Sequence, residues 1–290
     1  MMIRANGLEA YKELGRKQGE EALIEDYKLE ELLRCPSRYL KRKADEEAGA
    51  AAMLGTEVSW QQLVQYSVCH MVNDYYSLPP EHRSEYSIER SADRRWTNRT
   101  YKFDSADHYW QVRYRAVSAL KQLLHGEQNG AIRPLIVFES YRTHIEAVQA
   151  EVSFIVQVLY RADDRPDSPY VIRKYLVDDD PDVIAGFRHL AVLFCSEAFE
   201  ELPGRIEVFG VLSGSKYVFR PQADEVAKAA DYIRLLREYA QETETAAQEE
   251  EETGHMHRRR NVYRKCRHKA DYTHAGGSKA AKPTNRWQLN

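Results

Sequence analysis

Five carboxylates flank the two most apolar segments of the chain, where they could hold a metal ion. Two precede the run at 152–160 and three follow the run at 170–177: Glu146, Glu151, Asp178, Asp179 and Asp180. Carboxylates are ligands that Mg²⁺ prefers, and a bound Mg²⁺ can activate water and neutralise charge on a phosphate. The Asp run has a second interpretation, which we favour. At the N-terminus of a following helix its side chains would cap free N–H groups.

Two cations, Arg173 and Lys174, stand in the middle of the second apolar run. Successive side chains of a strand point to opposite faces of a sheet, so one of the two is expected to face a cleft. Lys174 could contact a phosphate directly. Equally, its flexible stem could carry the ammonium to the rim of the sheet, to pair with Glu146 or with an Asp of 178–180. Both interpretations stay open.

Other cations cluster near the start and the end of the chain, although the net charge is only −3. A basic helical element of this kind could contact nucleic-acid phosphates. Charge alone favours the plainer interpretation of a solvated helix face. The candidate nucleic-acid contacts are Arg38, Lys41, Arg42, Lys43, Lys174, Arg258, Arg259 and Arg260.

Residues 90–102 (RSADRRWTNRTYK) interleave Arg, Trp and Tyr. This composition is compatible with a loop that binds nucleic acid by stacking. It is equally compatible with an ordinary amphipathic surface loop, which is the interpretation we favour.

The four cysteines are far apart in the sequence and include no C-x-x-C pair. Free thiols in a cytoplasmic protein are therefore expected, and not a disulfide scaffold. Cys35, Cys266 and His268 could form part of a mixed zinc site, but their spacing is not a standard one. We favour a basic tail that happens to carry His, and we expect no cofactor.

The central region predicts a mixed α/β (α+β) core. Two strands are expected at 152–160 and 170–177, because both runs are apolar on both faces. A helix at about 183–201 and a hairpin over 205–219 follow. Further helices are expected at 57–76, 104–125 and 223–252.

The chain has room for one main domain with extensions. Residues 1–25 read as an N-terminal arm, 26–240 as the domain and 241–290 as a charged tail too poor in apolar residues to order itself. The N-terminus lacks the apolar stretch of a signal peptide, and no run reaches the length that spans a membrane.

The order of these features resembles one nuclease family. Cys35-Pro36 followed by Tyr39-Leu40 resembles its Cys-Pro-x-x-[FY] opening, and Leu54 to Ser59 resembles its Gly-Thr-x-x-His helix. The strands, helix and hairpin then follow in the family's order. The family comprises the nuclease domains of AddB/RecB-type helicase–nucleases and of CRISPR adaptation, within the PD-(D/E)xK superfamily. The resemblance covers residues 27–220 and implies a restriction-endonuclease-like sheet flanked by helices, with Mg²⁺ and often an iron–sulfur cluster.

The residues that carry the family's chemistry are replaced in this chain. The strand aspartate falls on Val156 or Gln157. The second metal-binding carboxylate falls on Lys174, and the catalytic lysine falls on Leu176. A lysine at a Mg²⁺ ligand position opposes metal binding, because two cations repel at close range. The cluster motif is also incomplete, since two of its cysteines are missing.

The sequence thus predicts a catalytically silent nuclease-like domain. It would bind nucleic acid, with DNA favoured, or a protein partner, or serve as an accessory subunit in DNA processing. No membrane partner is expected. One alternative is an active Mg²⁺-dependent DNA nuclease whose ligands have migrated to Glu146, Glu151 or the Asp run. Another is a protein-interaction scaffold on an old fold.

Overall fold

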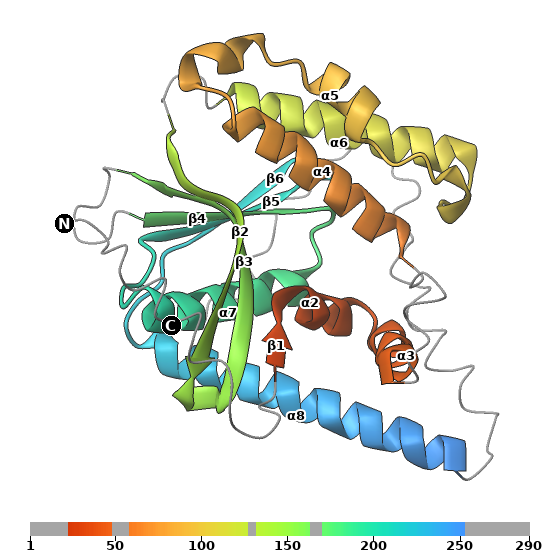
Figure 1. The fold of residues 1–290 in the computed structure, drawn as a ribbon, viewed down its shortest axis with the longest axis vertical. Coiled ribbons are helices and arrows are strands. Elements are labelled where there is room, and N and C mark those ends of the chain that lie inside the picture. The colour runs from red at the N-terminus through yellow and green to blue at the C-terminus, as the bar shows by residue number, and fades with distance from the viewer. Residues whose placement is uncertain (1–22, 48–57, 127–131, 163–169, 253–290) are drawn as a thin grey trace, which may run out of the picture.

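The computed structural model describes residues 23–47, 58–126, 132–162 and 170–252 (Figure 1). Within these residues the strands form one mixed six-stranded sheet. Strand β3 is antiparallel to β2 and β4, β4 is parallel to β5, and β5 is antiparallel to β6. The short β1 runs parallel to the start of β3. The strands are β1 (Leu23–Glu25), β2 (Pro134–Ile145), β3 (Ala150–Arg161), β4 (Tyr170–Leu176), β5 (Arg205–Gly210) and β6 (Ser215–Phe219).

Helices cover both faces of the sheet, which explains why β3 and β4 are apolar on both sides. On one face lie α4 (Trp60–Tyr76), α5 (Ile88–Arg95) and α6 (Ala106–His125). On the other lie α7 (Pro181–Ala198) and, beneath it, the long α8 (Glu225–Glu252), as Figure 1 shows.

Two further helices, α2 (Asp26–Arg34) and α3 (Pro36–Glu47), lie beside the sheet, and α2 packs against α7. Short 3₁₀ turns complete the described elements: η2 (Pro80–Glu85), η3 (Thr100–Lys102) and η4 (Glu146–Val148).

Polar side chains fix where the helices begin. The Ser59 side chain accepts from Gln62 N–H, and the Gln62 side chain accepts from Ser59 N–H, so α4 starts at Trp60 and not at the expected 57. Asp180 caps α7 by accepting from the N–H groups of Asp182 and Val183. The favoured interpretation of this aspartate as a helix cap is therefore confirmed.

The predicted mixed α/β class is confirmed, with helices on both sides of the sheet. The last residues of the expected N-terminal arm form β1, which joins the edge of the sheet. None of the helices described combines the length and the apolar character needed to cross a membrane.

Candidate functional site

The sheet opens between β3 and β4, and this opening is the candidate site. Strand β4 pairs with β3 only over residues 158–161, and β1 pairs with β3 at 151–153 on the same edge. Residues 154–157 of β3 therefore have no strand partner on that edge. Backbone groups left unpaired inside a protein are costly, so other groups must satisfy them.

Three side chains form hydrogen bonds with backbone groups of β3 and β4 at this opening. Asp26 Oδ2, at the start of α2, accepts from Ile155 N–H at 3.2 Å. Gln157 Oε1 accepts from Tyr175 N–H at 2.7 Å, and Gln65 Nε2 of α4 donates to the Tyr175 carbonyl at 2.7 Å. Elements from both faces of the sheet thus meet where the two strands part.

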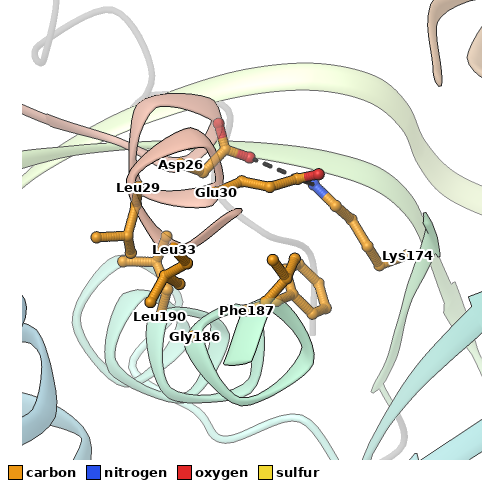
Figure 2. Close-up of a pocket in the computed structure, with 9 residues that line it drawn as sticks. Asp26, Leu29, Glu30, Leu33, Lys174, Gly186, Phe187 and Leu190 are labelled. Carbon is orange, nitrogen blue, oxygen red and sulfur yellow. Dashed lines mark ion pairs between the residues drawn. The ribbon is translucent and has the colours of Figure 1, made fainter. Parts of the chain in front are cut away.

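A largely buried group of charges occupies this opening. We call Asp26, Glu30 and Lys174 the Lys174 cluster. Lys174 Nζ lies 3.5 Å from Glu30 Oε2 and 3.9 Å from Asp26 Oδ2. Figure 2 shows both carboxylates reaching from α2 toward the lysine, which extends from β4. The ammonium also lies 5.3 Å from the centre of the Phe187 ring.

Helix α2 positions the two carboxylates because they are four residues apart and share one face. The same face carries Leu29 and Leu33, which line the small cavity against α7 (Figure 2). Gly186 of α7 allows this close approach, since a Cβ there would lie 2.5 Å from Leu33 Cδ1. The acidic side chains are therefore carried inward by the apolar ones.

Burial and charge oppose each other in setting the pKa values of the cluster. Burial would raise the pKa of Glu30, but Lys174 and Arg34 outweigh it and lower that pKa. Burial would lower the pKa of Lys174, but Glu30 and Asp26 outweigh it and raise that pKa. For Asp26 burial prevails over Lys174 and the Ile155 N–H, so its pKa is raised. Glu30 and Lys174 are consequently an ionised pair at neutral pH.

The cluster leaves little room for a ligand. The cavity between α2 and α7 has a volume of about 10 Å³, which is at the lower limit for one water molecule. Asp26 Oδ1 is buried and makes no hydrogen bond with a described residue. A protonated lysine cannot act as a base, and it already stands between the two carboxylates. The arrangement neutralises charge in place, with Asp26 and Lys174 buried and Glu30 half-buried.

Arg173, the neighbour of Lys174, points to the opposite face, as strand alternation predicts. It donates to the hydroxyls of Tyr76 and Tyr160 and pairs with the buried Glu207 at 2.6 Å. Lys216 also reaches Glu207, at 2.8 Å. Burial would raise the pKa of Glu207, but Arg173 and Lys216 outweigh it and hold that pKa at about 2.

The expected partners of Lys174 were wrong. It pairs with Asp26 and Glu30, and not with Glu146 or with an Asp of 178–180. It does not extend to the rim of the sheet either, because its side chain is only 8% exposed. Two carboxylates at the start of α2 hold the ammonium inside the protein.

The five carboxylates that flank the strands do not come together. Glu146 is exposed and lies beside His144, and Glu151 is at the start of β3. Asp178 pairs with Arg34, and Asp179 accepts from the hydroxyls of Ser213 and Tyr217. Among the residues that the structure describes, no group of three or more His, Cys, Asp or Glu is placed to hold a metal ion.

The basic residues of the first cluster lie on α3. Arg42 pairs with the buried Glu31 and stacks on Tyr39, so it stabilises the junction of α2 and α3. Arg38 and Lys43 are half-buried, whereas Lys41 is exposed. The tail cations Arg258, Arg259 and Arg260 lie outside the described residues.

Among the residues that the structure describes, no group of metal ligands lies around Cys35. Its sulfur is buried and lies 3.3 Å from Ser37 Oγ. Cys266 and His268 lie outside the described residues. Cys69 and Cys195 are free thiols, and burial raises the pKa of Cys69 to about 11.

Sequence reasoning missed Asp26, Glu30, Gln65 and the bridging role of Gln157. A signal for the first two was present, because Asp26 and Glu30 share the helical face of Leu29 and Leu33. Acidic residues on the apolar face of a helix indicate a buried partner of opposite charge.

No protein-family model matches the chain, and no curated protein matches it either. The nuclease resemblance therefore stands as a proposal.

Proposed function

We propose that this chain is a catalytically silent nuclease-like domain, which serves DNA processing as an accessory subunit on a restriction-endonuclease-like fold. The order of elements supports the proposal, because β3, β4, α7 and the β5–β6 hairpin follow the order that the resemblance implies. In that family the metal-binding and catalytic side chains come from the two strands that correspond to β3 and β4.

One observation supports the proposal that the site lacks catalytic activity. Lys174 Nζ stands within 3.9 Å of two carboxylates at the opening between β3 and β4. The ammonium is a cation on a covalent tether, and it neutralises the carboxylates that would otherwise attract Mg²⁺. A second cation in the same space would be repelled. The side chains of Asp26, Gln65 and Gln157 also occupy the opening, where they form hydrogen bonds with the backbone.

An active nuclease with migrated ligands is the second candidate, and one observation favours it. Asp26, Glu30 and Lys174 are two acids and a lysine, which are the residue types that the family's chemistry needs. The alternative requires the lysine to stand beside a metal ion and not between the carboxylates.

A cleavage assay separates the two candidates. Single- and double-stranded DNA are incubated with the protein and Mg²⁺ or Mn²⁺, and no cleavage above the protein-free control is expected. Cleavage that disappears in Glu30→Gln and persists in the matched exposed variant Glu146→Gln would establish the alternative. Cleavage lost in Glu146→Gln or Asp179→Ala would equally overturn the silent function.

A further inference from the structure

The outer face of α6 carries two large exposed aromatic side chains one helical turn apart. Trp110 is 56% exposed and Tyr114 is 75% exposed. Arg113 lies between them in sequence, with its guanidinium 5.4 Å from the centre of the Trp110 ring. We call Trp110, Arg113 and Tyr114 the α6 aromatic face.

The α6 aromatic face is held rigid from beneath. Tyr109 is buried, its ring packs edge-on against Phe103, and its hydroxyl donates to the Thr97 carbonyl. Arg113 pairs with Asp93 of α5 and so fixes the guanidinium over the Trp110 ring. Aromatic rings on a fixed helix face lose little entropy when a flat ligand stacks on them.

The surrounding segment is positively charged. Residues 88–126 contain eight Lys or Arg against four Asp or Glu, whereas the whole chain carries a net charge of −3. Asp93 and Glu89 are engaged by Arg113 and Lys121. Arg94 and Arg99 are exposed and form no ion pair with a described residue. The local field therefore suits a polyanion.

This face is separate from the Lys174 cluster. Helix α6 lies on the opposite side of the sheet from α7, whose Phe187 and Gly186 border the cluster (Figure 1). A ligand on α6 would not need access to the buried carboxylates.

We propose that the α6 aromatic face binds single-stranded DNA. Unpaired bases stack on Trp110 and Tyr114, whose Cα atoms are about 6 Å apart along the helix, while cations of the 88–126 segment contact the phosphates. Double-stranded DNA would bind more weakly, because its bases are already stacked on one another. The inference rests on the proposed accessory role in DNA processing, and it specifies single-stranded DNA as the form that the domain binds.

Binding is measured with a 5′-fluorescein-labelled 20-nucleotide oligo(dT) by fluorescence anisotropy, and tryptophan fluorescence is followed with the unlabelled strand. We expect saturable binding that quenches tryptophan emission and weakens as salt is raised. Trp110→Ala and Tyr114→Ala should each raise the Kd by about 5- to 150-fold, the range expected for the loss of one stacked base. Trp110→Phe and Tyr114→Phe should retain most of the binding.

Tyr239→Ala is the control, because Tyr239 is also an exposed aromatic residue but lies on α8, across the sheet. Circular dichroism verifies that each variant is folded. A Kd that is unchanged in both alanine variants, or equal affinity for a duplex of the same length, would overturn the inference. These binding results are independent of the cleavage assay. Only DNA cleavage in that assay would contradict the proposal that the domain is catalytically silent.

Discussion

Lys174 is a charged residue with almost no contact with water, and its state depends on two partners. The ammonium and the Glu30 carboxylate each compensate for the burial of the other. Removing one partner of a buried pair leaves the other charge buried without compensation. The free-energy cost of that change is much larger than the net stabilisation that the intact pair provides. The three residues of the cluster are therefore expected to behave as one unit.

The Lys174→Met variant tests this coupling. It keeps the unbranched stem of the side chain, one atom shorter, but leaves Glu30 and Asp26 without the ammonium. We therefore expect a loss of about 3–5 kcal/mol in the free energy of unfolding. Urea denaturation followed by circular dichroism measures it. Adding Asp26→Asn and Glu30→Gln to the same chain should recover a large part of the loss.

Lys228→Met is the matched control, since Lys228 of α8 forms an exposed ion pair with Asp224, the residue before the helix. Surface pairs contribute little to stability, so its urea midpoint should hardly move. Equal losses in the two lysine variants would show that the Lys174 cluster is not coupled through burial.

The lowered pKa of Glu207 predicts that the folded protein loses stability in acid. Its pKa is about 2 in the folded protein against 4.5 ordinarily, so folding favours the ionised form. The stabilisation is complete above pH 4.5 and is lost as the pH falls toward 2, up to about 3 kcal/mol. Urea midpoints measured from pH 5.5 to 2.5 test this. In Glu207→Gln the urea midpoint should depend less on pH in this range. An unchanged pH dependence would contradict the role assigned to Glu207.

At the scale of elements, the sequence predicted the strands and helices whose patterns are simplest. β3 and β4 are apolar on both faces, and α7 follows a run of aspartates that caps it. β2 is harder to predict from the sequence, because the residues that carry it to Ile145 alternate between half-buried and exposed. α5 was not predicted, since its eight residues are mostly charged and pack by few apolar positions.

The opening between β3 and β4 predicts a role for one glutamine. Gln157→Met removes the acceptor for Tyr175 N–H while keeping the volume of the side chain. We expect a loss of about 1–3 kcal/mol, because a buried donor is left without a partner. Urea denaturation measures it, with Gln222→Met at an exposed position as the control. Faster hydrogen exchange of the Tyr175 amide would accompany the loss, and a fully protected amide would contradict the bridging role.

At the scale of the whole molecule, the candidate site depends on residues that are distant in sequence. Asp26 meets Ile155 across 129 positions, and Gln65 meets Tyr175 across 110. A single sequence shows that Asp26 and Glu30 share one face of a helix. It does not show how close that face lies to Lys174 in the folded protein. This is why the sequence predicted a phosphate, Glu146 or an Asp of 178–180 as the partner of Lys174, and not Asp26 and Glu30.

The two sides of the sheet also differ in what they offer. On the α7 side the charges are buried and compensate one another, whereas on the α6 side aromatic rings and cations are exposed. We therefore propose that the α7 side holds a closed cluster of charges and that the α6 side is an open binding surface.

The central claim is that the Lys174 ammonium takes the place of a divalent cation, and calorimetric titration of Mn²⁺ tests it most directly. The account predicts that the wild-type protein shows no Mn²⁺ binding that depends on Glu30. It also predicts that Lys174→Met gains such binding and loses it again when Glu30→Gln is added. Mn²⁺ binding by the wild-type protein that Glu30→Gln abolishes would contradict the account.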